Sequence, residues 1–83
     1  MRVEVRLPQW GMGINEGTVV EWMKAVGDAV AEDEPLVEIE TAKAIDCVNA
    51  PVSGVLAEIV AQVGAVVPVS ELLAIIETDG DGS

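Results

Sequence analysis

Few side chains in this sequence could carry covalent chemistry. There are two lysines, Lys24 and Lys43, and one cysteine, Cys47, and there is no histidine. The absence of histidine removes the commonest general base and every Ser-His or Cys-His nucleophilic pair. A single cysteine forms no intrachain disulfide, and without histidine it offers no Cys/His zinc site. The sequence therefore predicts no catalysis by the chain alone, and it leaves two candidates for a modified amine.

Composition and charge narrow the class of protein. The 83 residues suffice for one small domain, expected over 1–78, and a hydrophobic content of 51% predicts folding despite the net charge of -11. The remaining residues, 79–83, are expected to be a tail or the start of a linker. With no apolar run of about 20 residues and no signal peptide, we expect a cytoplasmic protein that does not enter a membrane. The excess of acidic residues excludes nucleic acid and favours basic protein partners.

An internal repeat is the most informative feature of the chain. Residues 17–41 align without a gap on residues 54–78, at an offset of 37, and 10 of the 25 aligned pairs are identical. Each copy has a Val-Gly turn in its middle and ends in Ile-Glu-Thr. Two such units predict a fold with two-fold pseudosymmetry.

The repeat unit has the pattern of a strand, a tight turn, a short strand and a longer strand. Residues 37–40 alternate apolar and acidic side chains, as a half-buried strand requires. Residues 19–26 and 55–63 fit a strand or a short helix by periodicity, and their short length between glycines favours strands. Residues 2–7 are expected to form an edge strand, and residues 9–15 have the glycine content of a surface loop.

Lys43 lies where these elements predict the tip of a hairpin, between strands expected at 36–41 and 45–50. The turn pair Ala42-Lys43 contains no Gly or Asn, which favours a type I turn over the mirror-image turns. A lysine on a rigid, protruding turn is what a swinging prosthetic group needs, because its amine must reach several enzyme sites. An ordinary solvated turn lysine is the alternative interpretation.

The segment 40–44, Glu-Thr-Ala-Lys-Ala, resembles the lipoylation motif of lipoyl domains, which is usually Glu-(Thr/Ser)-Asp-Lys-Ala. The resemblance runs from Leu7 to Thr78 and includes an Ala-Pro-x-x-Gly link at 50–54. It implies an all-β fold, a flattened eight-stranded barrel or barrel-sandwich hybrid. Such a fold is made of two four-stranded antiparallel sheets with two-fold pseudosymmetry, which the repeat fits.

The same resemblance assigns roles to individual residues. It implies that lipoic acid is attached to Lys43 through an amide. Glu40 matches a position implicated in recognition by the lipoylating enzyme, although the second repeat has the same residue without a lysine. Ala44 completes the motif. Ala42 stands where the family usually has Asp, and this departure bears on recognition of the domain by ligases and partner enzymes. Trp10 lies in the loop that, in lipoyl domains, flanks the lysine and contributes to recognition by the decarboxylase; a packing role is the alternative.

The partners that the resemblance implies are the enzymes of a 2-oxo acid dehydrogenase complex. A lipoate ligase or lipoyl transferase would modify the lysine. The arm would then carry acyl groups and electrons between a thiamine-diphosphate decarboxylase, the acyltransferase core and a flavin-dependent dihydrolipoyl dehydrogenase. The chain would be part of, or accessory to, a dihydrolipoamide acyltransferase.

Three other functions are compatible with this kind of fold. A biotin carrier domain has its lysine at the same hairpin tip, but its usual motif is Ala-Met-Lys-Met, and Lys43 has alanine on both sides. Met23-Lys24 copies half of that motif, yet it precedes the Val-Gly turn inside a predicted strand. The lipoyl carrier of the glycine cleavage system is normally longer. An interaction domain without a prosthetic group is the third alternative.

Overall fold

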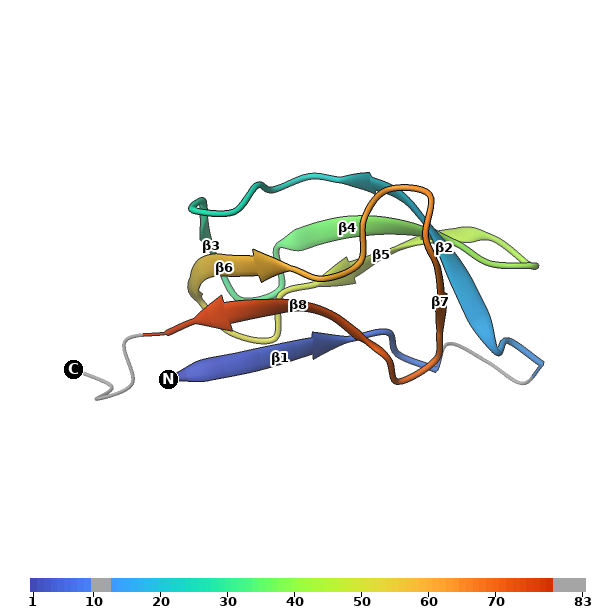
Figure 1. The fold of residues 1–83 in the computed structure, drawn as a ribbon, viewed down its shortest axis with the longest axis horizontal. Helices are drawn as coiled ribbons and strands as arrows, with labels where there is room; N and C mark the ends of the chain where they lie inside the picture. Colours follow the sequence, from blue (N-terminus) through green and yellow to red (C-terminus); the bar gives the residue numbers. More distant parts are fainter. Residues whose placement is uncertain (10–12, 79–83) are drawn as a thin grey trace.

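The computed structural model describes residues 1–9 and 13–78, and within these ranges it contains eight strands and no helix. The strands form two four-stranded sheets, with orders β1-β8-β6-β3 and β5-β4-β2-β7, and every pairing is antiparallel (Figure 1). The predicted all-β fold of two four-stranded antiparallel sheets is thus confirmed. The strand bounds are β1 Arg2–Arg6, β2 Glu16–Trp22, β3 Ala29–Val30, β4 Pro35–Glu40, β5 Ile45–Asn49, β6 Gly54–Ile59, β7 Val66–Pro68 and β8 Leu72–Glu77.

One hydrophobic core joins the two sheets. In the sheet of β5, β4, β2 and β7, the alternation of β4 turns Ile39 into this core and leaves Glu40 exposed at the end of the strand. The other sheet contributes Leu56 of β6 and Ile76 of β8 to the same cluster of buried side chains. Because burial of apolar surface is the main force that favours folding, this shared core holds the two sheets together in a molecule of 41 × 22 × 17 Å.

The sequence repeat appears as a two-fold pseudosymmetry of the strands. Exchanging β1 with β5, β2 with β6, β3 with β7 and β4 with β8 converts the order of one sheet into that of the other. The turns follow the same rule. Gly27 and Gly64 have φ of 97° and 91°, and Asp33 and Ser70 have φ of 70° and 75°. Each pair is related by the offset of the repeat, so the two copies share their turn conformations as well as their strands.

Hydrogen bonds between the copies interlock the two halves. The Gly27 N–H donates to the Leu56 carbonyl, and the Gly64 N–H donates to the Val19 carbonyl, both at 2.8 Å. The positive φ at both glycines suits the tight turn that presents these N–H groups, because glycine adopts that region without steric cost. Each repeat therefore supplies a turn that bonds to the middle of a strand of the other repeat.

The lengths of β2 and β6 differ from the prediction. Strand β2 ends at Trp22 and β6 at Ile59, so Lys24 lies in the bend after β2 and not inside a strand. The ladder continues for one further bond, from the Met23 N–H to the Leu36 carbonyl at 2.8 Å. The chain leaves the sheet there because the next residues run across to the other repeat. The tail predicted at 79–83 lies outside the described residues.

Candidate functional site

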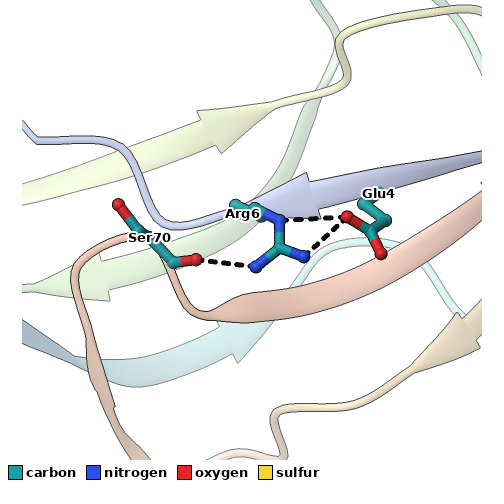
Figure 2. Close-up of polar contacts among 3 residues, drawn as sticks. All are labelled: Glu4, Arg6 and Ser70. Carbon is teal, nitrogen blue, oxygen red and sulfur yellow. Dashed lines mark hydrogen bonds and ion pairs between the residues drawn. The ribbon is translucent and has the colours of Figure 1, made fainter.

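The arginines of this acidic chain are held in ion pairs. The Arg6 guanidinium donates two hydrogen bonds to Glu4, at 3.1 and 2.6 Å, and a third to the Ser70 carbonyl at 2.9 Å (Figure 2). These bonds tie β1 to the turn before β8. The Arg2 guanidinium lies 3.4 Å from the Glu58 carboxylate of β6. Both arginines therefore serve the sheet that contains β1.

Lys24 is also engaged. Its Nζ lies 3.0 Å from a carboxylate oxygen of Glu34, and the lysine side chain is only 25% exposed. The other Glu34 oxygen accepts the Ala31 N–H at 2.9 Å. The Ala31 N–H and then the Lys24 ammonium hold the pKa of the Glu34 carboxyl below its usual value. At the repeat-related Glu71, a proline and an alanine replace these two donors.

Lys43 is the remaining cationic side chain, and its surroundings are different. It lies between β4 and β5, at the predicted hairpin tip, and it is exposed, as are Ala42 and Ala44 on either side. No ion pair in the described part of the chain includes it. The mirror-image turns require a positive φ at one or both central residues. Among the described non-glycine residues, only Asp33 and Ser70 have a positive φ, so the turn at Ala42-Lys43 is not a mirror-image turn, as predicted.

Thr41 closes this turn with both its backbone and its side chain. Its N–H donates to the Ala44 carbonyl at 2.9 Å, and its hydroxyl donates to the same carbonyl at 3.0 Å. The hydroxyl oxygen also lies 3.4 Å from the backbone nitrogens of Lys43 and Ala44, which donate to it. The lysine therefore extends from a backbone that is fixed on the side of β4.

An open groove of about 460 Å³ lies beside the turn. It is lined by residues 13–18, from the link before β2 and the start of that strand, and by residues 40–42. Glu40 is exposed at the end of β4 and pairs in register with Ile45 of β5. The predicted recognition residues Glu40 and Ala42 thus line this groove, and Lys43 follows Ala42 in the turn. Trp10 lies outside the described residues.

One feature of this region was not predicted from the sequence, and a second was implied only in part, by the loop that the family resemblance placed beside the lysine. One is the hydroxyl closure by Thr41, and the other is the approach of residues 13–18 to the end of β4. The repeat contained a signal for the first, because Thr41 has an identical partner in Thr78. The second follows from the pairing of β2 with β4 within one sheet, in which Thr18 lies opposite Glu40, and no local pattern encodes that pairing.

Comparison with known proteins gives concordant relatives. The family described as "Biotin-requiring enzyme", which covers biotin and lipoyl attachment, matches residues 3–76. The chain is 48% identical to the dihydrolipoyllysine-residue succinyltransferase component of the 2-oxoglutarate dehydrogenase complex of Bartonella vinsonii, over 93% of this chain and 19% of that protein. It is 46% identical to the acetyltransferase component of the pyruvate dehydrogenase complex of Mycobacterium bovis, over 93% and 14%. The chain thus spans about a fifth or less of these relatives.

Solved structures agree with this relationship. The lipoyl domain of the 2-oxoglutarate dehydrogenase complex from Azotobacter vinelandii superposes with a TM-score of 0.75 and 40% identity, over 94% of this chain and 99% of that one. Urea carboxylase from Kluyveromyces lactis gives a TM-score of 0.80 at 25% identity, over 93% of this chain and 6% of that one. Both relatives have the fold, but the lipoyl domain is the closer in sequence. The chain therefore belongs to the biotin and lipoyl attachment family, as a lipoyl domain of the kind found in acyltransferase components of 2-oxo acid dehydrogenase complexes.

Proposed function

We propose that this domain is a lipoyl carrier and that Lys43 is its attachment site. The observation that carries this proposal is the contrast between the two lysines. The Lys24 ammonium is paired and half-buried, whereas Lys43 is exposed on a closed turn without an ion pair among the described residues. An amine that no carboxylate of the described residues holds is available to a modifying enzyme.

The residues present fit a lipoyl group. Its attachment is an amide at the lysine Nζ, and this needs an amine that enters a ligase pocket and afterwards sweeps freely. When bound, the group supplies a dithiolane that takes up and releases acyl groups and electrons. The chain contributes the other half of the function: it holds the arm at the end of a rigid pair of strands, and tethering raises the effective concentration of the arm at each enzyme.

The partners we propose are a lipoate ligase or lipoyl transferase, a thiamine-diphosphate decarboxylase, an acyltransferase core and a dihydrolipoyl dehydrogenase. The names of the relatives support the complex as a class, and they divide between 2-oxoglutarate and pyruvate. The domain is proposed as a substrate of these enzymes and not as a catalyst, because its sequence has no histidine to act as a general base. The cytoplasmic location stays a prediction.

Biotin is the alternative cofactor, since the family includes biotin carriers and a urea carboxylase shares the fold. The residues beside Lys43 favour lipoic acid, because the alanines on both sides are small and the segment retains the Glu-Thr of the lipoyl motif. A biotin ligase that reads Met-Lys would find that pair only at Lys24, whose amine is held by Glu34.

Intact-protein mass spectrometry tests the proposal. The chain is co-expressed with a lipoate ligase or, separately, with a biotin ligase, and the modified residue is mapped by tandem mass spectrometry. We expect one lipoyl group, attached to Lys43. A biotin group would select the carboxylase alternative, and an unmodified chain in both cultures would favour an interaction domain without a prosthetic group.

A further inference from the structure

The pseudosymmetry places a second, open copy of the lysine turn at the opposite end of the molecule. There the chain begins at Met1 and leaves β8 at Thr78, and the two residues bond as a hairpin pair would. The Thr78 N–H donates to the Met1 carbonyl at 2.8 Å, and the Met1 amine donates to the Thr78 carbonyl at 3.1 Å. The Thr78 hydroxyl also donates to the Met1 carbonyl, at 3.3 Å. This end shows what the strand ends do when no turn joins them.

The lysine turn reproduces one half of that pair and changes the other. The Thr41 N–H and hydroxyl donate to the Ala44 carbonyl, as those of Thr78 do to Met1. The return bond differs, because the Ala44 N–H donates to the Thr41 hydroxyl and not to its carbonyl. The Lys43 N–H donates to that same hydroxyl. At the open end the return bond is accepted by the Thr78 backbone carbonyl. In the lysine turn, where residues 42–43 join the strands, the corresponding bonds are accepted by the Thr41 side chain.

The Thr41 hydroxyl is fully used in this arrangement. A hydroxyl has one hydrogen to donate and two lone pairs to accept with, and here all three are engaged. The two accepted bonds are long, at 3.4 Å, so each is weak by itself. They nevertheless end on the backbone of the lysine and of the residue after it. Threonine and serine hydroxyls commonly close turns in this way.

We propose that Thr41 is the positioning residue for modification of Lys43, and that its hydroxyl fixes the lysine backbone in the orientation that the modifying enzyme binds. This inference rests on the proposed lipoyl attachment. A turn that lacks the hydroxyl samples other orientations, and the ligase must select one of them. The ligase then binds only the fraction of domains whose turn has the right orientation, so its apparent affinity for the domain is lowered by that fraction.

The test compares three variants as substrates of a purified lipoate ligase. Thr41→Val removes the hydroxyl with little change in shape, Thr41→Ser keeps it, and Thr78→Val is the matched control at the repeat-related position. Loss of one net hydrogen bond corresponds to a factor of about five in an equilibrium. We expect Thr41→Val to raise the KM for the domain about fivefold with kcat nearly unchanged, and we expect the other two variants to behave like wild type.

A second measurement does not depend on activity. The ¹H–¹⁵N heteronuclear NOE of the Lys43 and Ala44 amides should be lower in unmodified Thr41→Val than in wild type, and unchanged in Thr78→Val. If the wild-type chain is no substrate of the ligase, the proposed function fails, and the NOE comparison still decides whether Thr41 holds the turn.

Four results would overturn the inference. They are a wild-type KM for Thr41→Val, an equal rise of KM in Thr78→Val, a KM for Thr41→Ser as high as that of Thr41→Val, and unchanged NOE values in Thr41→Val. If Thr41→Val does not fold, Thr41→Ala repeats the comparison, because it removes the hydroxyl without placing a methyl group in its position. Failure of both variants to fold would also refute the inference, since the hydroxyl would then be required for the fold.

Discussion

Moving the lysine by one residue separates the position of the amine from its chemistry. The double change of Ala42→Lys with Lys43→Ala keeps composition and net charge, and both positions are exposed. No described ion pair includes Lys43, so the free energy of unfolding should change by no more than about 0.5 kcal/mol. Adjacent side chains of a turn point in different directions, so the amine is aimed elsewhere. A reacting group misplaced by about 1 Å can slow a reaction by a factor of about 100, so the rate of lipoylation should fall by at least that factor.

Lys24→Ala is the opposite perturbation and the control. It removes an ion pair of 3.0 Å whose side chains are 25% and 34% exposed. Pairs that retain this much solvent contribute at most about 1 kcal/mol, and screening lowers that figure further. In a domain of this size such a loss lowers Tm by at most about 4–8 °C, yet lipoylation should be complete. Lys24→Ala, the less stable variant, is thus expected to be lipoylated, whereas the more stable variant with Ala42→Lys and Lys43→Ala is not.

The assay is intact mass after co-expression with a lipoate ligase, with a thermal melt of each purified variant. The reasoning is refuted if the shifted lysine is fully lipoylated, because the ligase would then accept any amine on this turn. It is equally refuted if Lys24→Ala loses the modification while it remains folded.

Three other substitutions test the turn, the sheets and the acid response. Ala42→Asp should leave the extent of lipoylation unchanged and alter the rate of reductive acylation by about twofold or more, because a charge at an interface rim mainly changes association; the reverse pattern would contradict this. In urea denaturation, Gly54→Ala should cost about 1–3 kcal/mol and more than Gly17→Ala, because its Cβ meets a backbone carbonyl, whereas the first obstacle at Gly17 is a side-chain methyl. A backbone N–H and a lysine ammonium lower the pKa of Glu34, so the stability it adds is present at neutral pH and is lost as the pH falls below about 4.5. Urea melts over a pH series should therefore show the deficit of Glu34→Gln shrinking in acid, and a deficit of Glu71→Gln that shrank equally would argue against the assigned contacts.

Much of the fold was predictable because the same strand and turn pattern occurs twice in the sequence. A period that recurs with identical glycines marks where the turns lie, and the alternation of Val37, Glu38 and Ile39 indicates which side of the strand faces the core. Those signals are local. The helix alternative for 19–26 was correctly set aside because β2 occupies its first half.

The rest depended on contacts between segments far apart in the sequence. The end of β2 at Trp22 follows from the crossing to the other repeat, and the pairing of Lys24 with Glu34 follows from that early end. The placement of Lys43 at a turn was predictable from the spacing of two strands. Its lack of an ion pair within residues 1–9 and 13–78 was not predictable, since the sequence has 15 acidic residues and only the fold decides which of them reach a cation.

The departures from two-fold symmetry concentrate at the end of the molecule that contains Lys43. Leu7 and Ala50 hold equivalent places after β1 and β5. The Leu7 N–H donates to the carbonyl of Glu71, just before β8, at 3.1 Å, and the Ala50 N–H donates to the carbonyl of Glu34, just before β4, at 2.8 Å. From there, residues 8–15 lead to β2, whereas only residues 51–53 lead to β6. The longer link brings residues 13–18 beside the end of β4, where they form the groove next to the lysine turn. The core strands treat the two ends alike. A partner that must find the lysine turn can therefore distinguish its end of the molecule from the end with Met1 and Thr78 by this link and by residues 42–43, which join β4 and β5.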